Sequence, residues 1–86
     1  MSQNKEDLKN KIIYRATYRG TKEMDILMTT FVNSLINKLD ENYLKILDLF
    51  VNLDDETLIS LKKKESSSNY KDEKMLHIIR KFQKFK

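Results

Sequence analysis

The chain has no cysteine, no proline and no tryptophan, and it has one glycine, Gly20, and one histidine, His77. Without cysteine there is no disulfide framework, no thiolate nucleophile and no cysteine-ligated metal site. A single histidine rules out metal sites built on paired histidines. The scarcity of glycine and proline argues against the turn-rich strands of a sandwich or a barrel. These absences predict an all-α protein.

The length of 86 residues predicts one domain, residues 1–86, with a small core. No apolar run reaches the roughly 18–20 residues that a membrane-spanning helix needs. The first seven residues carry acids and no apolar stretch, so they resemble neither a secretory signal nor a transit peptide. We therefore expect a soluble cytoplasmic protein without membrane insertion. The mitochondrial matrix is the less favoured location.

The formal net charge is +4, and only three of the basic residues are arginine: Arg15, Arg19 and Arg80. Acidic residues concentrate between residues 40 and 56, whereas the chain from Lys62 onward is strongly basic. Such asymmetry can steer a partner without identifying it. The basic tail supports an alternative in which the chain is a small nucleic-acid-binding bundle. Against this, no helix spaces arginine or asparagine for contacts to base edges.

The apolar periodicity predicts a bundle of about five short helices. The first two are expected at about 5–18 and 22–39. Asp40 and Asp54 read as the N-caps of the third and fourth, and the last runs at about 71–82. The domain would comprise a core part at about 5–61, a Ser-rich linker at 65–69 and a C-terminal helical part at about 70–84. The expected core is Leu8, Ile12, Leu27, Phe31, Leu35, Leu44, Leu47, Phe50, Leu58, Leu61, Ile78 and Ile79.

Three features are not part of this predicted core. Ile26 falls on the opposite side of its helix, where either a second helix covers it or it is an exposed contact; a wrapped central helix favours the first. His77 is expected to face solvent, where it is a surface residue rather than an acid–base catalyst. The run at 62–64 is expected to be a solvated helix end.

Gly20 stands between two helical runs, with Arg19 before it and Glu23 after it. A glycine at a helix end usually adopts a positive φ, so Gly20 predicts a sharp bend between the first two helices. One interpretation is helix punctuation, with the Glu23 carboxylate reaching back to a free backbone N–H as in a capping box. Punctuation explains Arg19 less well, because lysine would serve the helix dipole equally.

The longer pattern Tyr-Arg-Ala-x-x-Arg-Gly-x-x-Glu-Met-Asp-x-Leu, from Tyr14 to Leu27, is followed by an apolar helix and by Leu53-Asp54-Asp55-x-x-Leu58. This arrangement resembles the succinate dehydrogenase assembly factors over roughly residues 8–61, with a looser match in the last helix. The chain departs from that family at two positions. A proline often follows the paired acids there, and a tryptophan follows the leucine by three residues; this chain has Glu56 and Leu61.

The resemblance implies a small helical bundle that acts as an assembly chaperone and not as an enzyme. Its partner would be the flavoprotein subunit of succinate dehydrogenase, or of the related fumarate reductase. It would promote covalent attachment of FAD to that subunit and bind no cofactor or metal itself. By position, the partner surface would comprise Arg19, Gly20 and Glu23, with Arg15 and Asp25 beside them, all facing outward on a monomer. A generic interaction module is the alternative, and a small enzyme relying on electrostatic stabilisation ranks last.

Overall fold

A computed structural model describes residues 5–63 and 70–85 of the chain. Within them the structure is all-helical, which confirms the expected fold class. The elements are α1 (Lys5–Thr17), α2 (Lys22–Leu35), the 3₁₀ turn η1 (Ile36–Lys38), α3 (Glu41–Val51), α4 (Asp55–Lys62) and α5 (Glu73–Lys84). The linker expected at 65–69 lies outside the described residues.

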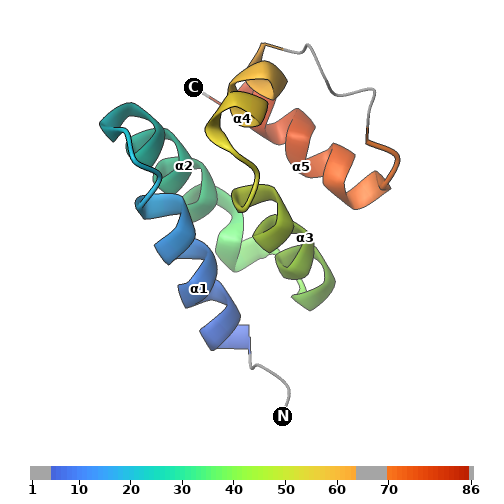
Figure 1. The fold of residues 1–86 in the computed structure, drawn as a ribbon. Helices are drawn as coiled ribbons and strands as arrows, with labels where there is room; N and C mark the ends of the chain where they lie inside the picture. The colour runs from blue at the N-terminus through green and yellow to red at the C-terminus, as the bar shows by residue number, and fades with distance from the viewer. Residues whose placement is uncertain (1–4, 64–69, 86) are drawn as a thin grey trace.

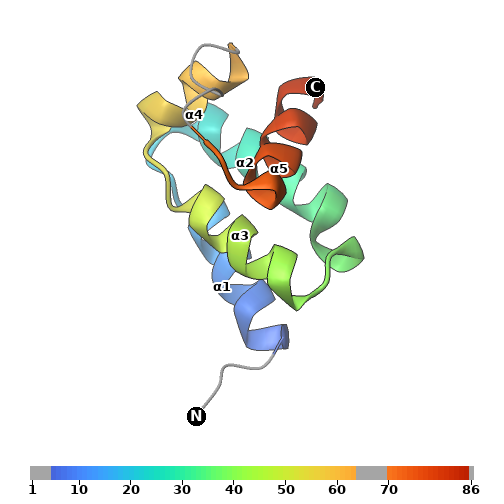
Figure 2. The same cartoon turned by 90° about the vertical axis from the view of Figure 1, so that its right-hand side faces the viewer.

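The helices surround a single apolar core (Figure 1). α1 and α2 run side by side in opposite directions, joined by the bend at Gly20. α3 lies against α1 on one side and α5 on the other, and the short α4 packs on α5 (Figures 1 and 2). The end of α5 returns to α2, where Phe85 lies beside Glu23 and Ile26. The beginning of α2 therefore has the bend on one side and the end of α5 on the other.

Aspartate caps begin three of the helices. The carboxylate of Asp40 accepts a hydrogen bond from the Tyr43 N–H at 2.9 Å, and that of Asp54 accepts one from the Thr57 N–H at 3.3 Å. Both caps were predicted and are confirmed. Hydrogen bonds from Thr57 lower the pKa of Asp54, because they favour its ionised form. Asp72 caps α5, which therefore begins at Glu73 rather than at about residue 71.

Nearly all of the predicted core is buried, the exception being Leu27, which is only partly covered. The centre is aromatic. The Phe31 ring lies 5.8 Å from Phe50, 5.1 Å from Phe82 and 5.4 Å from Phe85, measured between ring centroids. Leu61 is fully buried, so it fills a core position where the resembling family carries an aromatic. α2, α3 and α5 are thus held together by one cluster of rings.

Two expectations about α2 were wrong. The helix ends at Leu35 and continues only as the η1 turn, because Leu39 is already extended, with φ −98° and ψ 144°, to reach the cap of α3. Ile26 is 57% exposed, since none of the described helices covers that side of α2 near its start. The central helix is therefore incompletely wrapped and leaves an apolar side chain at the surface.

Lys62 is not the solvated helix end that the sequence predicted. Its ammonium donates to the carbonyl oxygen of Phe82 at 2.5 Å and to that of Phe85. It also lies 4.9 Å from the centroid of the Phe82 ring. Partial burial lowers the pKa of Lys62. The residue ties the end of α4 to the end of α5, where the helix dipole is negative.

Candidate partner-binding site

The bend is built from a helix stop, a glycine and a helix start. α1 ends at Thr17, and the Tyr18 N–H still donates to the Tyr14 carbonyl at 3.2 Å. Gly20 has φ +110°, which confirms the predicted positive φ. The Thr21 hydroxyl then accepts from the Met24 N–H at 3.3 Å and begins α2. Only glycine adopts this backbone conformation without strain.

The Arg19 side chain points into the molecule, and its expected outward orientation was wrong. Its Nε and Nη2 lie 3.0 Å and 2.9 Å from Oδ1 of Asp55, and its remaining donors bond the carbonyl oxygens of Val51 and Leu53. The side chain is 10% exposed. A guanidinium presents five donors in a rigid fork, so one arginine satisfies the end of α3 and a carboxylate of α4 together. This explains why arginine, and not lysine, occupies the position.

Two neighbouring residues brace the same junction. The Asp25 carboxylate accepts a hydrogen bond from the backbone N–H of Arg19 at 2.6 Å and so closes the bend. One turn earlier on α1, Nη1 of Arg15 lies 2.5 Å from Oδ1 of Asn52, the residue that ends α3. Arg15 is exposed, and Asp25 is half-buried. The predicted site residues are therefore neighbours, but three of them also fix the bend to α2, α3 and α4.

Glu23 is exposed, and it makes no hydrogen bond or ion pair with any residue of 5–63 or 70–85. The capping-box interpretation was wrong. Because Thr21 is the N-cap, Glu23 is the second residue of the helix, and a capping box requires the third, which is Met24. The carboxylate still lies in the first turn, where the positive helix end favours it. Its charge is directed to solvent beside the bend.

Exposed apolar side chains lie on both sides of the bend. Tyr14 and Tyr18 are 65% and 70% exposed, with their ring centroids 4.8 Å apart, and the exposed Ile26 lies on the first turns of α2. The sequence analysis named Ile26 as a possible contact but not the tyrosine pair. The four-residue spacing of the tyrosines, at the end of the helix predicted at about 5–18, was the available signal. Clustered exposed apolar residues are typical of a protein-binding surface.

The two aspartates at the start of α4 are used by the fold. Asp54 is a helix cap, and Asp55 is the partner of Arg19. In the described part of the chain, no group of three or more histidine, aspartate or glutamate side chains is arranged to hold a metal ion. None of the helices in that part is long and apolar enough to cross a membrane.

The described residues form a small helical bundle whose bend carries an exposed carboxylate and exposed apolar side chains. Residues 10–83 match the family Sdh5, described as the flavinator of succinate dehydrogenase, and the chain belongs to that family. Its members are assembly factors rather than enzymes, and they promote covalent attachment of FAD to the flavoprotein subunit of succinate dehydrogenase. The match extends into α5, where the sequence resembled the family only loosely. No curated protein and no solved structure matches the chain significantly.

Replacing Gly20 by alanine is expected to lower the free energy of unfolding by about 1–2 kcal/mol, because an L-residue is strained at this φ. No atom lies within 4 Å of the added Cβ, so the backbone alone accounts for the loss. Thermal denaturation followed by circular dichroism should show a melting temperature lower by about 5–15 °C. Asn33→Ala, at an exposed position on α2, is the control and should change little. An unaltered melting temperature for Gly20→Ala would show that the bend does not depend on glycine.

Proposed function

We propose that the bend is the surface that meets the flavoprotein subunit. In this proposal Gly20 and Glu23 contact the partner directly, while Arg19, Asp25 and Arg15 hold the bend in place. The observation that carries it is the free Glu23 carboxylate beside a backbone that is fixed from three sides. A charge kept in position before binding loses little conformational freedom when the partner arrives.

The chemistry that such a surface supplies is positioning. Covalent attachment of FAD requires a histidine of the flavoprotein to meet the flavin in a productive orientation. A rigid corner that holds a mobile capping domain of the partner restricts the competing geometries, and this effect can account for a large part of a rate enhancement. The assembly factor then needs no nucleophile and no cofactor of its own. It acts as a monomer on the FAD of its partner.

The partner proposed here is the flavoprotein of succinate dehydrogenase, with the fumarate reductase flavoprotein as a related substrate for assembly. The protein would work where that subunit folds, which we propose to be the bacterial cytoplasm rather than the mitochondrial matrix. Neither nucleic acid nor a membrane takes part. Flavinylation assays with the two purified flavoproteins distinguish these substrates.

Glu23→Lys is expected to reduce flavinylation at least about tenfold while lowering stability by no more than about 1 kcal/mol, because the side chain loses only its favourable place at the positive helix end. In-gel flavin fluorescence of the co-expressed flavoprotein measures the labelling. The matched control is Glu73→Lys, which reverses an exposed charge in the first turn of α5. Full labelling of the flavoprotein by Glu23→Lys would remove Glu23 from the proposed interface.

A further inference from the structure

Four surface hollows follow one another along α2 and η1, and each shares lining residues with the next. The first begins at Tyr18 beside the bend and shares Ile26 and Thr30 with the second. Phe85 lines both the second hollow and the third. The third shares Lys38 and Lys81 with the fourth, which ends near Tyr43 and His77. We call this surface the α2–α5 furrow.

The half of the furrow nearer the bend is mainly apolar. Ile26, Leu27 and Phe85 line the largest of its four hollows, which has a volume of about 460 Å³, together with Glu23 and Thr30. Ile26 is the exposed residue that the fold leaves uncovered. Beyond Phe85, the next hollow of about 340 Å³ has Phe31 and Phe85 as its floor. An apolar side chain docked here would be shielded from water on several sides.

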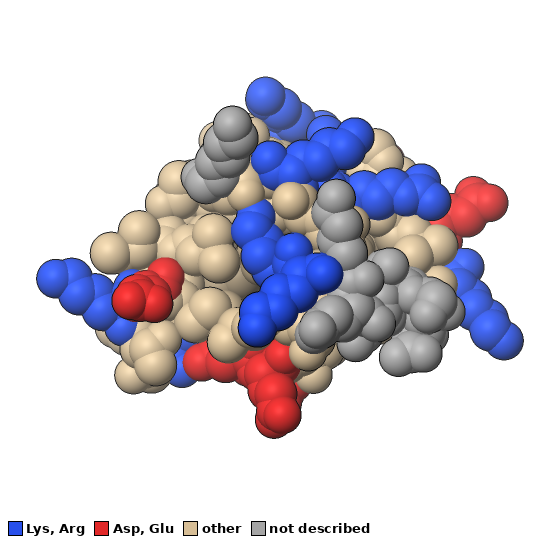
Figure 3. Space-filling view, turned by 90° about the horizontal axis from the view of Figure 1, so that it is seen from above, with Lys and Arg blue, Asp and Glu red and all other residues tan. Residues whose placement is uncertain are grey.

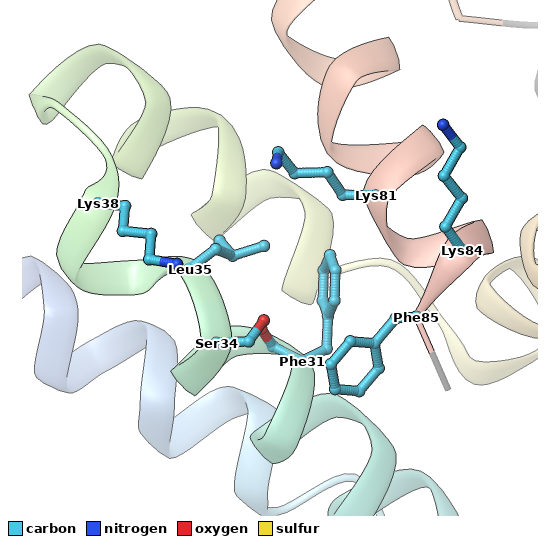
Figure 4. Close-up of a pocket in the computed structure, with 7 residues that line it drawn as sticks. All are labelled: Phe31, Ser34, Leu35, Lys38, Lys81, Lys84 and Phe85. Atoms are coloured by element: carbon cyan, nitrogen blue, oxygen red, sulfur yellow. The ribbon is translucent and has the colours of Figure 1, made fainter.

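The far half of the furrow is basic. Lys38 comes from one wall, and Lys81 and Lys84 come from α5 on the other, above the two phenyl rings (Figure 4). All three lysines are exposed, and none makes an ion pair or hydrogen bond with a described residue. Asp40 lies at the far end of the furrow, where its carboxylate accepts a hydrogen bond as the N-cap of α3. The end of the molecule that carries α4 and the end of α5 shows basic side chains gathered across it, with acids toward its margins (Figure 3).

We propose that the α2–α5 furrow binds a segment of the flavoprotein subunit in which bulky apolar residues are followed by aspartates or glutamates. The apolar residues occupy the hollow between Ile26 and Phe85, and the carboxylates meet Lys38, Lys81 and Lys84. The identity of the partner rests on the proposed function, and the furrow adds a second contact zone that continues from the bend. The bend then fixes the orientation of the partner, while the furrow supplies area and charge steering.

The shape of the furrow favours a protein segment over a small anion or a nucleic acid. α2 has 14 residues and is thus about 21 Å long, more than a small ligand covers. Half of that length is apolar and offers nothing to a phosphate backbone. An apolar stretch beside three unneutralised ammonium groups is instead complementary to a chain that carries both kinds of side chain.

The triple variant Lys38→Glu, Lys81→Glu, Lys84→Glu tests the charge complementarity. Titration calorimetry with the purified succinate dehydrogenase flavoprotein should show a dissociation constant raised by about 30-fold, with a weaker dependence on salt. The control, Lys45→Glu, Lys63→Glu, Lys71→Glu, has the same net charge but lies outside the furrow and should bind like the wild type. Equal binding by the two triple variants overturns the proposal.

A second measurement locates the partner segment directly. Because the natural chain has no cysteine, Thr30→Cys places a unique thiol in the furrow for a maleimide photo-crosslinker, and Lys45→Cys on α3 is the control. The flavoprotein peptide crosslinked at position 30 should contain apolar residues next to aspartate or glutamate. A crosslinked peptide without carboxylates contradicts the proposal.

Three further outcomes distinguish failure of the furrow from failure of the proposed function. If sedimentation shows a wild-type dimer that the furrow triple variant dissociates, the furrow binds a second copy of this chain and the proposal is overturned. If Glu23→Lys abolishes flavinylation while the furrow triple variant binds normally, only the furrow fails. If the wild-type chain does not bind the flavoprotein, the proposed function and the furrow fail together.

Discussion

Arg19→Ala is expected to lower the free energy of unfolding by about 3 kcal/mol and the melting temperature by about 10–20 °C. The substitution removes a largely covered guanidinium and leaves the Asp55 carboxylate and the carbonyl oxygens of Val51 and Leu53 without their donors. Urea unfolding followed by circular dichroism measures the change. The effect is large because one side chain joins the end of α1 to the α3–α4 junction.

Two variants show whether charge alone explains this loss. Arg19→Lys retains the charge but not the planar fork, so it should recover only part of the stability. Arg80→Ala removes an exposed arginine and should change stability by less than about 0.5 kcal/mol. If Arg19→Ala is as stable as Arg80→Ala, the hydrogen bonds of Arg19 contribute nothing to the fold. The guanidinium of the wild-type protein would then be available to a partner.

This expectation changes how bend variants must be interpreted. If the Arg19 side chain faced outward, alanine at this position would abolish activity and spare the fold. Since the side chain braces the bend, lost flavinylation in Arg19→Ala follows from either instability or lost contact. Glu23→Lys separates the two, because that carboxylate has no partner among the described residues. Flavinylation by the arginine variant should therefore be measured at a temperature where the variant is folded.

Phe31→Ala is expected to destabilise the protein by about 3–5 kcal/mol, a large share of the stability of a domain this small. The ring is 1% exposed and touches Phe50, Phe82 and Phe85, so its removal opens a cavity where three helices meet. Urea denaturation should show a midpoint far below that of the wild type, or a chain already unfolded without urea.

Phe31→Leu is the matched variant, because it keeps the position apolar and should lose only about 1–2 kcal/mol. Tyr14→Ala removes an aromatic ring that is mostly exposed and should be nearly neutral. A Phe31→Ala protein with the wild-type midpoint would show that the aromatic cluster does not hold α2, α3 and α5 together.

Much of the fold could be predicted because its causes are local. Apolar residues spaced three and four apart predicted the helices and nearly all of the core, and Asp40 and Asp54 identified two helix starts. The positive φ of Gly20 followed from the position of the only glycine in the chain. The family could also be identified from the sequence, since the motif at the bend and the Leu53–Leu58 pattern occur together.

The candidate site was predicted in composition but not in arrangement. The sequence pattern placed Arg19 and Glu23 at the same bend. It could not show that the Arg19 guanidinium bonds inside the molecule whereas the Glu23 carboxylate faces solvent. That difference depends on the carbonyls of Val51 and Leu53, more than thirty residues away. Glu23 was assigned to a capping box because Gly20 was counted as the N-cap, whereas the N-cap is Thr21, one residue later.

The sequence by itself determined the helical class, the core, the bend and the family, since these depend on spacing and residue type along one stretch of chain. Only the tertiary structure decided that Ile26 stays exposed, that Lys62 caps a neighbouring helix and that lysines from η1 and α5 line the same furrow. Those outcomes depend on which distant surfaces meet, and periodicity shows which face of a helix is apolar without showing what covers it.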